Sequence, residues 1–143
     1  MGSAGGTEGD VGDVIDRFKL YFILGKIYKI HLNKTLIGTT RLEKADAPMG
    51  VVFGEILFSN IPSGYDFFKE FCVKNNVEFT DYPEDKLIST SHIPGLQIFD
   101  IKEKEIKGLS NSISGMDNDV FEITIEGIDY PFYEEEFPHH VKS

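Results

Sequence analysis

Residues 63–76 read SGYDFFKEFCVKNN and carry the clearest helical pattern of the chain. Ser63 can cap the first turn, and Asp66 follows three positions later, as in an acidic version of the capping box. One stripe at helical spacing is apolar, and the opposite side is charged. The apolar stripe comprises Tyr65, Phe68 and Cys72, widened by Phe67 and Phe71. We therefore predict one main amphipathic helix at about 63–76, with Cys72 packed in the core.

Strand patterns flank this helix on both sides. Residues 120–125 alternate most clearly, with Phe121, Ile123 and Ile125 on one side of the chain. Further strands are expected at residues 26–32, 36–42, 51–58, 97–101 and 105–109. About six or seven strands with one main helix predict an α+β fold, mainly an antiparallel sheet covered on one face.

The connections carry turn-forming residues. Residues 33–35 suit a three-residue hairpin loop, and residues 111–119 and 81–86 read as irregular and polar. Residues 1–13 hold five glycines and are predicted to be a flexible N-terminal segment, followed by a single α+β domain over residues 14–143. Residues 14–24 fit a helix or a strand equally well.

The acidic charge is concentrated in the second half of the chain. The net charge is −10 over 143 residues. From Glu78 onward there are fifteen acidic and five basic residues, whereas the preceding part balances nine against nine. Such a surface repels phosphate backbones and attracts a basic partner, so no nucleic acid is expected as a ligand.

The composition also limits the setting of the protein. A single cysteine excludes an internal disulfide and suits a reducing compartment, so a cytoplasmic protein is expected. No stretch approaches the roughly 18 apolar residues of a membrane span, and no membrane contact is expected.

No residue pattern predicts catalysis, a metal site or a cofactor. Residues 117–119, DND, resemble the opening of a calcium loop but lack the glycine and the oxygen ligands that should follow. His139 and His140 follow three glutamates on what reads as an extended charged tail, where adjacent side chains point apart. His31 and His92 have no nucleophile or carboxylate beside them in sequence.

Two segments are candidates for contact with a partner. The first combines aromatic and acidic residues, the mixture found in interface hot spots. It comprises Tyr130, Phe132, Tyr133, Glu134, Glu135 and Glu136. The second is a loop in which Asp46 can bond to the backbone ahead of it, Pro48 fixes φ and Gly50 permits a positive φ. Its residues of interest are Asp46, Pro48, Met49 and Gly50.

Residues 42–54 read LEKADAPMGVVFG and have the form Leu-Glu-x-x-Asp-x-Pro-Met-Gly-Val-x-Phe-Gly. This segment resembles one found in small uncharacterised bacterial proteins with no assigned activity. The resemblance covers about a tenth of the chain. It implies a bacterial origin and carries no activity with it.

Three functions fit these observations. The first is a non-enzymatic protein-interaction module, such as an acidic immunity-type inhibitor that binds a basic protein. The alternative is a small enzyme or small-ligand-binding protein with a pocket between helix and sheet. A homo-oligomer that pairs through an uncovered sheet edge is the third.

Overall fold

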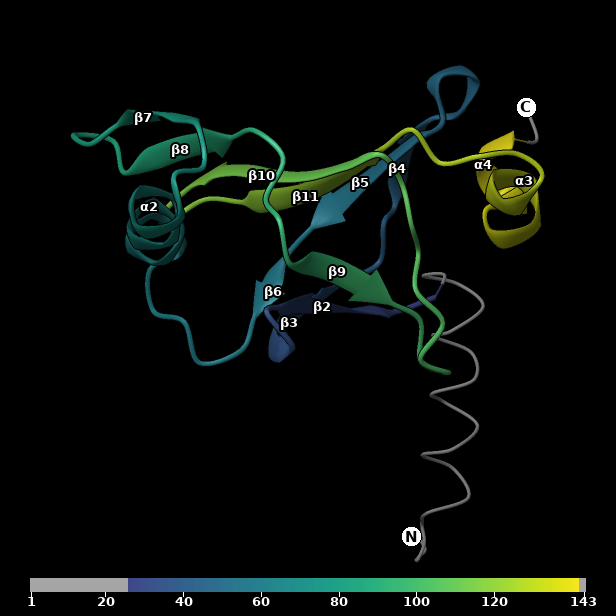
Figure 1. Cartoon of the computed structure of the whole chain (residues 1–143), viewed down its shortest axis with the longest axis horizontal. Helices are drawn as coiled ribbons and strands as arrows, with labels where there is room; N and C mark the ends of the chain where they lie inside the picture. Colours follow the sequence, from purple (N-terminus) through teal and green to yellow (C-terminus); the bar gives the residue numbers. More distant parts are fainter. Residues whose placement is uncertain (1–25, 142–143) are drawn as a thin grey trace, which may run out of the picture.

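A computed structural model describes residues 26–141 and shows an α+β fold with two antiparallel sheets (Figure 1). The expectations for residues 1–13 and 14–24 lie outside the described residues. The strands are β2 (Tyr28–Leu32), β3 (Thr35–Thr40), β4 (Lys44–Asp46), β5 (Val51–Glu55), β6 (Leu57–Phe58), β7 (Phe79–Tyr82), β8 (Leu87–Thr90), β9 (Leu96–Phe99), β10 (Ser110–Met116) and β11 (Phe121–Glu126). The helices are the 3-10 turn η1 (Ala47–Met49), α2 (Gly64–Asn75), α3 (Phe132–Glu136) and α4 (Pro138–Val141).

The larger sheet has the strand order β4-β5-β11-β10-β8-β7, and the smaller one has the order β6-β3-β2-β9. In Figure 1, α2 and the smaller sheet lie on the same side of the larger sheet, and α3 and α4 lie at its β4 end. One cluster of buried apolar side chains draws on both sheets and on α2. Ile30, Phe68 and Ile123 are each fully buried in it.

The main helix forms where the sequence predicts it. The Ser63 hydroxyl oxygen accepts a hydrogen bond from the backbone N–H of Asp66 at 3.0 Å. The helix ends at Asn76, which adopts the left-handed conformation. Tyr65, Phe68 and Cys72 are buried, as their spacing indicates.

The prediction of an irregular loop over residues 111–119 is wrong for its first part, because β10 runs through it. Alternate residues of β10 point inward and pack closely. The Asn111 side-chain amide donates to the Leu96 carbonyl at 2.6 Å, and a Cβ at Gly115 would lie 2.5 Å from Cα of Phe121. Residue types that favour turns are therefore used here for tight inward packing and a buried hydrogen bond.

Three other boundaries differ from the sequence expectations. Of residues 81–86, which were expected to be irregular, Asp81 and Tyr82 belong to β7, and residues 83–86 form the turn to β8. The strand expected over residues 51–58 is interrupted at Ile56, so that β5 belongs to one sheet and β6 to the other. Residues 105–109 form only an isolated bridge between Glu105 and Phe99.

The β2–β3 hairpin has a two-residue turn instead of the expected three-residue loop. Leu32 pairs with Thr35, which leaves Asn33 and Lys34 as the turn. Both have positive φ, 49° and 72° respectively. This is the geometry of a type I′ turn, in which the second position favours glycine.

We expect Lys34→Gly to raise the free energy of unfolding by about 1 kcal/mol, because glycine adopts positive φ without the steric penalty of a Cβ. Denaturant unfolding measures this change. Lys34→Ala removes the same charge while keeping the Cβ, and serves as the matched control. An equal gain in both variants would show that charge, not backbone conformation, limits this turn.

Candidate partner-binding surface

The structure brings together the two segments that the sequence singled out separately. The loop around η1 projects at the β4–β5 end of the larger sheet, and the segment after β11 passes beside it (Figure 1). The Ile128 N–H donates to the Gly50 carbonyl at 3.0 Å. Tyr130 Oη donates to the Ala47 carbonyl at 3.0 Å, and Tyr133 Oη donates to the Val51 carbonyl at 2.9 Å.

Gly50 makes this close approach possible. Its φ is 67°, and a Cβ at this position would lie 2.8 Å from the carbonyl oxygen of Ile128. The sequence expectation of a positive φ at Gly50 is therefore confirmed. The expected bond from Asp46 is not, because its side chain makes no capping hydrogen bond to η1.

We define the corner surface as the exposed residues Asp46, Pro48, Met49 and Tyr130. Met49 is 68% exposed and Tyr130 is 49% exposed. Glu134 and Glu135 are exposed on the adjoining helix α3. The corner surface thus combines apolar area with nearby carboxylates.

The remaining members of the predicted aromatic and acidic set face inward. Tyr133 and Glu136 are buried, and Phe132 is half-buried. The Tyr133 ring stacks on Tyr130, with centroids 5.3 Å apart. Burial, together with the nearby Tyr130 and the carboxylate of Asp46, raises the pKa of Tyr133 to about 12. Its hydroxyl therefore stays protonated and keeps its hydrogen bond to Val51.

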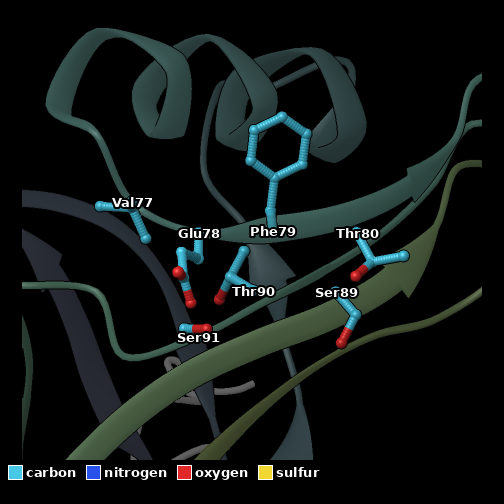
Figure 2. Close-up of a pocket in the computed structure, with 7 residues that line it drawn as sticks. All are labelled: Val77, Glu78, Phe79, Thr80, Ser89, Thr90 and Ser91. Atoms are coloured by element: carbon cyan, nitrogen blue, oxygen red, sulfur yellow. The ribbon is translucent and has the colours of Figure 1, made fainter.

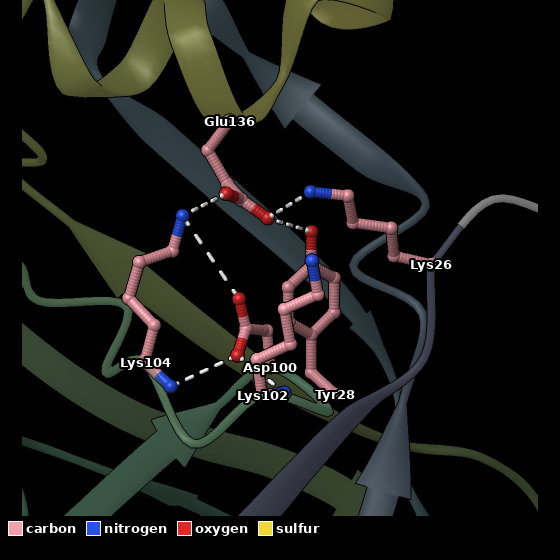
Figure 3. Close-up of polar contacts among 6 residues, drawn as sticks. All are labelled: Lys26, Tyr28, Asp100, Lys102, Lys104 and Glu136. Carbon is pink, nitrogen blue, oxygen red and sulfur yellow. Dashed lines mark hydrogen bonds and ion pairs between the residues drawn. The ribbon is translucent and has the colours of Figure 1, made fainter.

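Glu136 connects α3, near the C-terminus, to the region around β2 of the smaller sheet (Figure 3). Its carboxylate accepts hydrogen bonds from Lys26 Nζ at 2.9 Å, Tyr28 Oη at 2.8 Å and Lys104 Nζ at 2.9 Å. The Glu136 side chain is 2% exposed, whereas Lys26 and Lys104 are about half exposed. A buried carboxylate with three donors is well satisfied, and the two lysines keep contact with water.

Asp100 extends this network beneath Lys104. Its Oδ1 accepts the backbone N–H groups of Lys102 at 2.8 Å and Lys104 at 2.9 Å. Burial acts to raise the pKa of Asp100, but these two N–H donors and the charge of Lys104 outweigh it and lower the pKa. For Glu136, burial likewise opposes ionisation, and the bonds from Lys104, Lys26 and Tyr28 together hold its pKa below the ordinary value.

The other chemically interesting residues lie apart from this network. His31 packs against the Phe99 ring at 5.2 Å between centroids, and Nδ1 of His92 accepts the Asn111 N–H at 3.0 Å. Burial raises the pKa of the Cys72 thiol, which disfavours the reactive thiolate. The carboxylate of Asp117 accepts hydrogen bonds from the Ser63 hydroxyl and the Tyr65 N–H.

The expected charged tail is instead folded. Residues 132–141 form α3 and α4, with Phe137 buried between them at 1% exposure. One ring nitrogen of His140 lies 2.9 Å from the Leu42 carbonyl. Within residues 26–141, no three His, Cys, Asp or Glu side chains gather as metal ligands would.

The described part of the chain contains no helix that is both long and apolar enough to cross a membrane. Comparisons with protein-family models, with curated proteins and with solved structures find no match to this chain.

We expect Glu136→Gln to lower the free energy of unfolding by about 2 kcal/mol at neutral pH, because it removes charge-assisted hydrogen bonds from two lysines. Denaturant unfolding measures the loss. Glu134→Gln, an exposed change of the same kind two residues away, should stay within about 0.5 kcal/mol of the wild type.

The pH dependence gives this experiment a second readout. Since the pKa of Glu136 is lower in the folded chain, its contribution to stability is present above the ordinary glutamate pKa of 4.5 and disappears as the pH falls through the folded value. Glu136→Gln should therefore flatten the stability profile below about pH 4.5. A profile parallel to that of the wild type would contradict the assigned role.

Proposed function

We propose that this chain is a non-enzymatic protein-interaction module that binds a basic protein, in the manner of an acidic immunity-type inhibitor. The observation that carries this proposal is the corner surface. There, Met49, Tyr130 and Asp46 are exposed together, and Glu134 and Glu135 are exposed on the following helix α3. Large apolar side chains ringed by charge are typical of the centre and rim of a protein interface.

Hydrogen bonds between the two segments of the corner surface support the same function. The hydrogen bond from Tyr130 to Ala47 and the backbone bond from Ile128 to Gly50 fix the two segments against each other. A surface that is ordered before binding loses less conformational entropy when a partner docks. The net charge of −10 would accelerate the encounter with a basic partner.

The proposal extends to the setting of the protein. A cytoplasmic location agrees with a single cysteine, Cys72, that is buried and reduced. The similarity of residues 42–54 to a segment of small bacterial proteins supports a bacterial origin. An immunity-type inhibitor would act there by covering the active or binding surface of a basic partner.

The alternative, a small-ligand binder, rests on a depression of about 310 Å³ between the start of α2 and the β10–β11 turn. Asp117 lines it, but its carboxylate is occupied by Ser63 and by the N–H of Tyr65. Neither His31 nor His92 lines this depression. Since the polar group that would bind a ligand already stabilises the fold, the interaction module is the better supported function.

We expect Met49→Ala combined with Tyr130→Ala to weaken partner binding by roughly 30-fold or more, as truncation of paired hot-spot residues does. The assay is affinity capture from a lysate of the native host, with bound proteins identified by mass spectrometry. Capture by the wild type should fall between about 0.1 M and 1 M salt, over which the screening length shrinks from ~10 Å to ~3 Å.

Leu57→Ala combined with Val73→Ala is the matched control, since both side chains are 62% exposed and lie away from the corner surface. The control variant should retain the captured partner. A partner that binds all variants equally, or no salt-sensitive partner at all, would argue against the proposed function.

A further inference from the structure

The larger sheet has one buried face and one face that no described element covers. Ile88, Ile113 and Ile123, on three neighbouring strands, are at most 2% exposed and point into the core. Residues next to them in each strand point the other way. In Figure 1, α2 and the smaller sheet lie below the larger sheet, while nothing in the described chain lies above β10 and β11. We call this uncovered side the open face.

Strand register aligns the outward side chains of the open face in rows. One row crosses five strands, because Thr80 pairs with Ser89, Ser89 with Ser114, Ser114 with Glu122 and Glu122 with Glu55. Directly opposed residues in a sheet point to the same side. None of these five residues is buried. The row therefore consists of hydroxyl groups at one end and carboxylates at the other.

The middle of the open face carries short side chains. The central strand β10 presents serines there at Ser110, Ser112 and Ser114, and larger side chains border them: Phe53 on β5, and Met116, Leu87 and Tyr82 in one paired row. The solvated face of an antiparallel sheet is normally polar, but β-branched residues such as threonine are favoured there over serine. Departures from local preference concentrate at functional surfaces. Serines leave room for a partner to approach the sheet closely and offer it hydroxyl groups for hydrogen bonds.

The charge of the open face is negative. Lys44 Nζ binds the Glu122 carboxylate at 2.7 Å and neutralises it. Glu55 lies beside Glu122, and Glu126 lies four residues further along the strand of Glu122, so both carboxylates also point outward. Two identical acidic faces would repel each other, whereas a basic surface would be attracted.

A hollow of about 650 Å³ marks the β7–β8 end of the open face. Figure 2 shows that Phe79 points toward α2, while Glu78, Thr80 and Ser89 point away from it. The exposed carboxylate of Glu78 therefore stands among hydroxyl groups in a concave site. A lysine or arginine side chain reaching across these hydroxyls could pair with it.

The area of the open face indicates that a stable interface there would also include the corner surface. Six strands spaced ~4.8 Å apart and about five residues long cover roughly 400 Å². A stable interface buries about 800 Å² on each partner, so the open face alone is too small. The corner surface adjoins it directly, because β4 ends at Asp46 and η1 begins at Ala47.

We infer that the open face, continued by the corner surface, is the docking surface for a basic protein whose lysine and arginine side chains meet Glu55, Glu126 and Glu78. This inference rests on the proposed function and specifies its partner. The partner presents a flat, basic surface that contacts the serine-rich centre without inserting large side chains into the sheet.

The first test maps binding on the unmodified full chain. An oligolysine peptide is titrated into ¹⁵N-labelled protein, with oligoglutamate as the reference probe, and amide chemical shifts are recorded. Oligolysine, but not oligoglutamate, should shift amide signals, and these shifts should concentrate on β8, β10, β11 and residues 46–50. They should disappear in high salt. Shifts confined to α2 or spread evenly over the acidic residues would overturn the inference.

The second test blocks the open face. Ser114→Arg should weaken oligolysine binding and capture of the host partner by about tenfold, since it places a long cation at the centre of the serines. Ser59→Arg adds the same charge at an exposed position outside the larger sheet and should change binding less than twofold. Equal effects of the two variants would overturn the inference.

Comparing the Met49→Ala/Tyr130→Ala double variant with Ser114→Arg distinguishes this inference from the proposed function. If Met49→Ala with Tyr130→Ala abolishes capture of the partner while Ser114→Arg does not, the partner binds at the corner surface alone and the open face has no part in docking. If none of these variants affects capture, both the inference and the proposed function fail.

Discussion

The alternation of side chains on β11 is the constraint on which the rest of the structure depends. Phe121, Ile123 and Ile125 point inward, and this fixes the inward side of β5 and β10, which pair with β11 on either edge. A shift of one residue would place those isoleucines in water and the glutamates in the core. The same constraint therefore generates the buried core and, as its necessary counterpart, the acidic open face.

The segment that follows β11, up to Glu136, is the second feature that organises the fold, because it contacts both the loop around η1 and the smaller sheet. Tyr130 and Tyr133 bind the loop around η1, and Glu136 binds the smaller sheet through Lys26, Tyr28 and Lys104. The segment is thus fixed from two sides. This explains why a stretch rich in acids and aromatics is ordered, and why its exposed residues stand in a defined position relative to the larger sheet.

The sequence predicted those parts of the fold in which local pattern and tertiary packing agree. The helix over 63–76 carried both its caps and its apolar stripe, and β11 alternated strictly. The sequence did not predict strand β10, because its serines, asparagine and glycine are residue types that favour turns. Their packing and hydrogen bonds depend on neighbours such as Leu96 and Phe121, which lie elsewhere in the chain. At the candidate site the sequence identified both segments but not their contact. It gave no signal for the Glu136 network, whose members are separated by 32 to 110 positions.

The Glu136 network also has a consequence for the order of folding. Lys26 and Glu136 are 110 positions apart and enclose nearly all the described chain. Closing a loop of that length before either sheet exists costs several kcal/mol of chain entropy with little local gain. Hairpins such as β10–β11 close short loops and can form early. The two ends of the described chain therefore join late, and a newly made chain would present its hairpins before its corner surface is complete.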